Sequence, residues 1–67
     1  MALSARNQLP GTVRSVVLGA VMAEIVVAVG GSDMVSVITR RSAESLDVKA
    51  GDELSVVIKS TDVMLEK

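Results

Sequence analysis

The sequence predicts an all-β fold, a small five-stranded barrel with one short helix between the third and fourth strands. Three observations lead to this prediction. Apolar and polar residues alternate with a period of two through most of the chain, which is typical of strands. Short turns rich in glycine or polar residues separate the alternating runs, and one stretch, residues 40–46, breaks the alternation. With 67 residues the chain is expected to form a single domain, 1–67.

Each alternating run is interpreted as one strand. The expected strands cover residues 9–17, 22–29, 34–39, 54–59 and 63–66. Pro10 cannot donate a ladder hydrogen bond, so the start of the first strand is expected at an edge, a bulge or a strand entry. The clearest turn is the Gly-Gly-Ser-Asp sequence at 30–33, a hairpin signal. Shorter breaks are expected at 19–20, 49–52 and 60–62.

The interruption at 40–46 is predicted to be a short helix. A hydroxyl of Thr39 or Ser42 could accept hydrogen bonds from its first N–H groups, and Ala43 and Leu46 share one helix face. The resulting order, three strands, a helix and two strands, is that of the OB-fold, a small five-stranded barrel. An OB-fold-like barrel is therefore the expected architecture.

Composition favours a homo-oligomer. Hydrophobic residues make up 49% of the chain and the mean hydropathy is +0.51. A lone core of this size contributes only about 3–5 kcal/mol, and without cysteine no disulfide can add to it. The second expected strand is largely apolar on both faces, which indicates that both faces are covered. We therefore expect this chain to associate with copies of itself.

The same composition argues against several functions. Histidine and cysteine are absent, so the commonest general base and the commonest transition-metal ligand are missing, and we expect neither an enzyme nor a metal or cofactor site. Aromatic residues are also absent and the net charge is −1, which disfavours nucleic-acid binding. Glu24 interrupts the apolar segment 15–32, so a membrane span is not expected. Without a signal-peptide pattern, we expect a cytoplasmic location.

One chemistry remains open to these residues, which is the binding of a small oxyanion by N–H, O–H and cationic donors. Such donors gather in three polar breaks beside expected strands: 4–7 before the first strand, 39–42 at the helix start and 59–61 after the fourth strand. Each segment also has a purely structural interpretation, as a strand end, a helix cap or a solvated turn.

All three segments resemble the molbindin (Mop) family of small molybdate-binding proteins, part of the transport-associated OB-fold group. The matching stretches are SARNQL at 4–9 followed by Gly11, ITRRSAE at 38–44 and IKSTDVM at 58–64. The stretches occur in the family's order, and the resemblance extends over essentially the whole chain. The resemblance implies cytoplasmic molybdate storage or homeostasis by a homohexamer, a trimer of dimers, with molybdate at subunit interfaces.

The resemblance also implies which residues bind the anion. They are Ser4, Ala5 (through its backbone), Arg6 and Asn7 on one side of the anion and Lys59, Ser60 and Thr61 on the other, with Arg6 and Lys59 expected from different subunits. Thr39 and Ser42 match residues that contribute in related molybdate-responsive domains. Tungstate, nearly the same size as molybdate, is expected to bind as well. The alternative function is an oxyanion-sensing or assembly module that works with a separate regulator or transporter protein.

Overall fold

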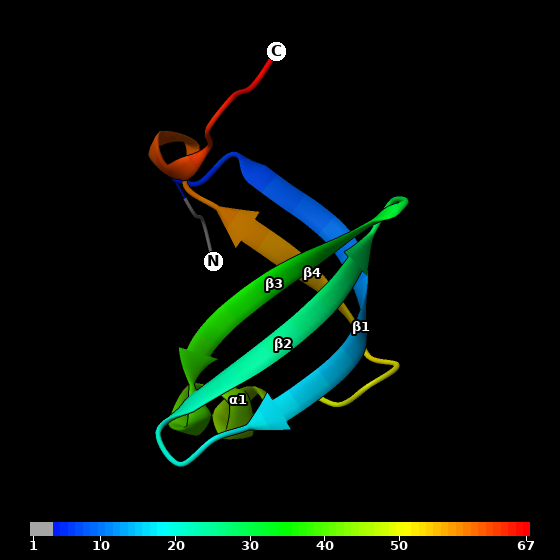
Figure 1. Cartoon of the computed structure of the whole chain (residues 1–67), viewed down its shortest axis with the longest axis vertical. Helices are drawn as coiled ribbons and strands as arrows, with labels where there is room; N and C mark the ends of the chain where they lie inside the picture. Colours follow the sequence, from blue (N-terminus) through cyan, green and yellow to red (C-terminus); the bar gives the residue numbers. More distant parts are fainter. Residues whose placement is uncertain (1–3) are drawn as a thin grey trace.

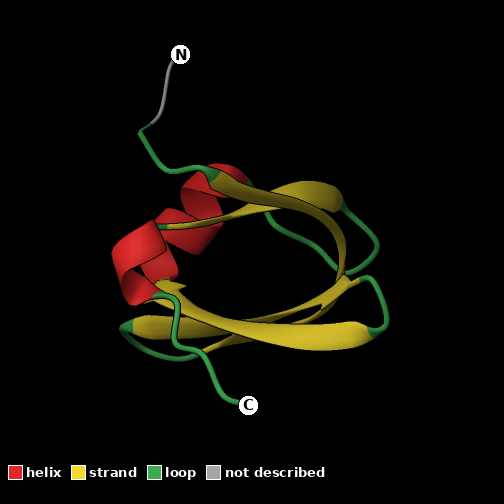
Figure 2. Cartoon of the chain, turned by 90° about the horizontal axis from the view of Figure 1, so that it is seen from above, coloured by secondary structure: helices red, strands yellow, loops and turns green. Residues whose placement is uncertain are grey.

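The computed structural model describes residues 4–67, and residues 1–3 of the predicted domain lie outside the described residues. Four antiparallel strands form one sheet in the order β3-β2-β1-β4. The sheet curls into a barrel with β3 and β4 as its edge strands (Figures 1 and 2). The elements are β1 (Asn7–Leu18), β2 (Met22–Val29), β3 (Ser32–Thr39), α1 (Arg40–Leu46), β4 (Glu53–Ile58) and a 3₁₀ helix, η1 (Ser60–Asp62).

β1 is the longest strand and belongs to both halves of the barrel. Its first half pairs with β4, from Asn7 opposite Ile58, and its second half pairs with β2. The ladder with β2 shifts by one residue between Val13 and Ser15, which is a β-bulge. Bulges bend a strand and increase its twist. The bulge therefore lies where β1 passes from one half of the barrel to the other.

The β2–β3 hairpin is tighter than expected. Val29 pairs with Ser32, so only Gly30 and Gly31 form the loop, although the sequence suggested a turn over residues 30–33. Gly30 has a φ of 60°, a backbone conformation that glycine adopts without steric cost. Two-residue loops of this kind match the right-handed twist of the flanking strands, so pairing continues to the hairpin tip.

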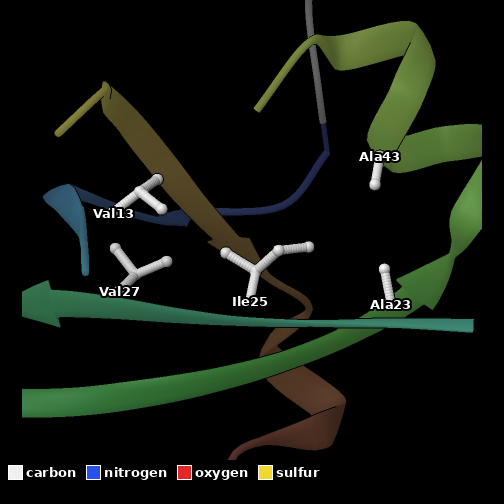
Figure 3. Close-up of a cluster of buried hydrophobic side chains, with 5 residues drawn as sticks. All are labelled: Val13, Ala23, Ile25, Val27 and Ala43. Atoms are coloured by element: carbon white, nitrogen blue, oxygen red, sulfur yellow. The ribbon is translucent and has the colours of Figure 1, made fainter. Parts of the chain in front are cut away.

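The core is small and aliphatic. Its buried side chains are Val13, Ala23, Ile25, Val27 and Ala43. Figure 3 shows Ala43 of α1 directed toward Ala23 of β2, so the helix closes one end of the barrel. Two facing alanines allow this close approach of helix and strand.

The predicted helix is confirmed, and Thr39 caps it. The Thr39 side chain accepts a hydrogen bond from the Ser42 backbone N–H at 3.0 Å. At the other end Asp47 adopts the left-handed conformation with φ 53°, and its N–H bonds to carbonyls of the last turn.

Among residues 4–67, no helix has the length and apolar character needed to cross a bilayer.

The fifth strand, expected over 63–66, is wrong for this chain by itself. After β4 the chain turns through η1, where the Asp62 N–H donates to the Lys59 carbonyl at 2.9 Å, and residues 63–67 continue without regular structure. Figure 1 shows this tail leading away from the sheet. Strand formation requires a neighbouring edge to pair with, and the tail does not run along one. Its side chains consequently stay exposed: Val63 46%, Met64 91% and Leu65 94%.

Candidate functional site

Two of the three donor-rich segments meet at one end of the barrel. Asn7 pairs with Ile58, the last residue of β4. Because these strands are antiparallel, Arg6 and Lys59 leave the sheet on neighbouring paths from that pair. Figure 1 shows the segment before β1 next to η1. The fold thus brings together the sequence-predicted segments 4–7 and 59–61.

The donors at this end are open to solvent. Ser4, Arg6, Lys59, Ser60 and Thr61 are exposed, whereas Ala5 and Asn7 are half-buried. A single chain therefore leaves most of these donors at its surface.

A further residue, Gln8, was missed as a candidate although it lies within the matched segment. Its side-chain amide donates to the Ala5 carbonyl at 3.1 Å. This bond ties the segment before β1 to the strand and so orders the backbone beside Arg6. The signal that could have identified it was its position three residues after Ala5, a spacing that permits such a local turn.

Charge is available at this site. Within residues 4–67, Arg14, Arg40 and Lys49 form ion pairs with acidic side chains, at 3.0, 3.7 and 3.2 Å respectively. Arg6 and Lys59 form no ion pair with any residue of that range. Two cations without acidic partners can neutralise a dianion with little competition.

The third segment lies at the opposite end of the barrel. Thr39, the last residue of β3, pairs with Met22 of β2, and α1 begins directly after it. The Thr39 and Ser42 hydroxyls bond to each other at 2.8 Å in addition to the cap bond. Within one chain the structure therefore does not bring Thr39 and Ser42 to Arg6 and Lys59, and their contacts there are those of a helix cap.

Asp62 is the acidic residue nearest to the donors in sequence. It lines a cavity of about 450 Å³ between the edge strands β3 and β4, together with Met34 and Val56. Apolar residues of both edge strands form the walls of this cavity, and Asp62 adds one carboxylate to its lining.

Fold and site together define a small β-barrel binding domain with an exposed cluster of anion-compatible donors. Residues 3–65 match the TOBE domain, and the chain belongs to this family. The resemblance to the Mop proteins is confirmed by closely similar relatives.

One relative is the molybdenum-pterin-binding protein 3 of Clostridium pasteurianum, 54% identical over 97% of each chain. Among solved structures, a molybdate-binding protein from Sporomusa ovata superposes with a TM-score of 0.96 at 39% identity over the full length of both chains. The cytoplasmic molybdate-binding protein ModG, in a form with molybdate bound, gives a TM-score of 0.83 at 37% identity, over 97% of this chain and 53% of that one.

Proposed function

We propose that this protein binds molybdate, and tungstate equally well, and stores the anion in the cytoplasm without acting as an enzyme. The observation that carries the proposal is the register of Asn7 with Ile58, which brings Arg6 and Lys59 together from opposite ends of the sequence. Molybdate is a tetrahedral dianion that only accepts hydrogen bonds, so a cluster of cationic, hydroxyl and backbone donors suits it. The names of the relatives support the same ligand.

The proposal places the anion between subunits. One subunit contributes the cluster formed by Ser4, Ala5, Arg6, Asn7, Lys59, Ser60 and Thr61, and a neighbouring subunit contributes Thr39 and Ser42. Two observations support this arrangement. The cluster is exposed in one chain, and Thr39 and Ser42 are too far along the barrel to reach the same anion from that chain.

The proposed assembly is a homohexamer, a trimer of dimers. It is supported by the small core, by the exposed apolar tail and by outward-facing valines on the sheet. A chain of this size gains little stability alone, and burial of this apolar surface against other copies would supply more.

The name of the Clostridium relative raises a second ligand, a molybdenum-bearing pterin. Pterin rings are flat and are commonly held between aromatic side chains, but this chain contains no Phe, Tyr or Trp. The donor cluster suits a bare oxyanion better. A role as a sensing or assembly module with a regulator or transporter remains the alternative function, and it predicts capture of a second protein at low anion stoichiometry.

Native mass spectrometry with and without molybdate tests the proposal, because it reports subunit number and bound anions together. We expect a hexamer whose mass increases by whole molybdate units, and calorimetry should show saturable binding. A protein that binds no molybdate at micromolar concentration, or that binds a molybdenum-free pterin in its place, would contradict the proposed ligand.

A further inference from the structure

The outer face of the sheet carries a charge in an apolar surface. Ala23, Ile25 and Val27 of β2 point into the core, so Glu24 and Val26 point outward. Glu24 lies between Val17 of β1 and Val37 of β3, and the next outward row along the strands is Ser15, Val26 and Val35.

Three of the four valines in these two rows are exposed to an unusual degree for β-branched side chains, and the fourth, Val26, is half-buried. Val17, Val35 and Val37 are 60%, 63% and 60% exposed. Apolar patches of this kind, when contiguous, mark interaction surfaces. Among residues 4–67 no cation pairs with Glu24, and its four nearest neighbours on the face, Val17, Val37, Met22 and Val26, are apolar.

A cation lies at the other end of the same face. Arg14, the extra residue of the β1 bulge, bonds to both carboxylate oxygens of Asp33 on β3, at 3.0 and 3.3 Å. Because β2 lies between β1 and β3, the Arg14 side chain crosses β2 close to Ala28, which pairs with Asp33. Only Nη1 of the guanidinium is used within residues 4–67, so its other N–H donors are free to bind a second carboxylate.

The spacing of these charges is self-complementary. Glu24 and Ala28 each lie two residues from Val26 along β2, about 6.8 Å in an extended strand. Consider two such faces packed against each other around a two-fold axis that lies between them, perpendicular to the strands and at Val26. The rotation reverses the strand direction, so Glu24 of one copy lies opposite Ala28 of the second. The Arg14 guanidinium of that second copy crosses this position, and symmetry produces the same pair twice.

We propose that the outer face of β1, β2 and β3 is a two-fold contact between copies of this chain, and that Glu24 pairs there with Arg14 of the second copy. The valines supply the apolar area, with Val26 and Val35 packing on their own symmetry mates. The charge pair sets the register, since a shift along the strands would bury Glu24 without a partner. This inference rests on the homo-oligomer proposed above and assigns its surface.

The first test places a charge on the face. Val37→Lys, at an exposed position, should keep the β-sheet content in circular dichroism but split the assembly into smaller species in native mass spectrometry. Leu46→Lys is the matched control, because Leu46 is also exposed, at 67%, but lies on α1 away from this face. The control should retain the wild-type mass.

The second test is a double-mutant cycle on the dissociation of the assembly upon dilution. Glu24→Gln and Arg14→Gln should each raise the dissociation constant about 10-fold, and the double variant should lose no more than the worse single one. Strictly additive losses, or tighter assembly of the Glu24→Gln variant, would overturn the pairing. A wild-type oligomer that Val37→Lys leaves intact would overturn only the placement of the contact. Wild-type protein with the mass of one chain would overturn the proposed assembly itself.

Discussion

Asn7 lies opposite Ile58 at the end of the β1–β4 ladder, and this single pair joins two segments from opposite ends of the sequence. The residues that precede Asn7 and follow Ile58 leave the sheet at the same end, so Arg6 and Lys59 lie on neighbouring stretches of chain. Two cations on neighbouring stretches of chain repel each other, and an anion bound between them relieves that repulsion.

The first prediction concerns these two cations. Arg6→Ala or Lys59→Ala alone should weaken molybdate binding by roughly 1.5–3 kcal/mol, the value of a charge-assisted hydrogen bond. The double variant should depart from the sum of the two losses, because both groups act on one anion. Calorimetry of the four proteins measures the cycle.

Lys49→Ala is the matched control for that cycle. Lys49 is an exposed cation that pairs with Asp47 in the turn after α1, away from the donor cluster. Its removal should leave the affinity unchanged. Light scattering should show the same oligomer for all variants, and a loss of affinity that follows dissociation of the assembly would indicate a structural role instead.

The second prediction concerns selectivity. Molybdate and tungstate should bind with similar affinity, and sulfate at least ~10-fold more weakly, about 1.4 kcal/mol. The three ions share shape and charge, so donors alone cannot separate them, and the dimensions of the closed site must do so. Competition calorimetry measures the ratio. Equal affinity for sulfate would reduce the site to a general anion site.

The third prediction separates helix capping by Thr39 from its proposed contact with the anion. Thr39→Asp keeps a good helix cap but adds a negative charge, so the melting temperature should remain while molybdate affinity falls by at least about 10-fold. Thr39→Ser retains the hydroxyl and should bind like the wild type. If Thr39→Asp binds molybdate normally, Thr39 only caps α1 and does not contact the anion.

The fourth prediction concerns the close contact of β1 with β2. A Cβ at Gly11 would lie 2.6 Å from Val27 Cγ1 and 2.9 Å from the Ala28 carbonyl oxygen. Gly11→Ala should therefore destabilise the protein by roughly 1–3 kcal/mol, because the backbone carbonyl cannot move aside easily.

Gly31→Ala provides the comparison in chemical denaturation. A Cβ at Gly31 meets nothing within 4 Å, and its φ is not in the positive range. The free energy of unfolding should stay within about 0.5 kcal/mol of the wild type, or rise slightly as the unfolded chain loses freedom. Equal losses for both variants would mean that Gly11 matters through backbone freedom and not through the close contact.

Local patterns predicted most of this fold. Alternation located the four observed strands, and the break in alternation at 40–46 located α1, because both patterns depend on neighbouring residues only. The sequence left the cap open between Thr39 and Ser42, and the structure assigns it to Thr39. The tail at 63–66 alternates equally well, yet it forms no strand. Strand formation there depends on a pairing edge, which is a property of the tertiary or quaternary structure and not of the segment.

The sequence also selected two of the segments that the fold brings together at the candidate site. Donor types and segment similarity selected Arg6 and Lys59, and the β1–β4 register then brought them together. The separation of Thr39 and Ser42 from this cluster could not be predicted from the sequence, because it depends on how far the curved β1 carries the chain along the barrel. Gln8 was overlooked because its contribution is a bond to a backbone carbonyl, not to a ligand.

The bulge at Arg14 provides a position where β1 can lose one residue without reversing the faces of its side chains. Because Arg14 is the supernumerary residue, a gene that lost this codon would encode a regular ladder in which Val13, Val16 and Leu18 keep their inward faces. Loss of Val17, by contrast, would reverse the faces of the residues beyond it. Loss of a residue within the β1–β2 ladder should therefore be tolerated better at Arg14 or Ser15 than at Val17, although the strand without Arg14 would bend less and would lack the ion pair with Asp33.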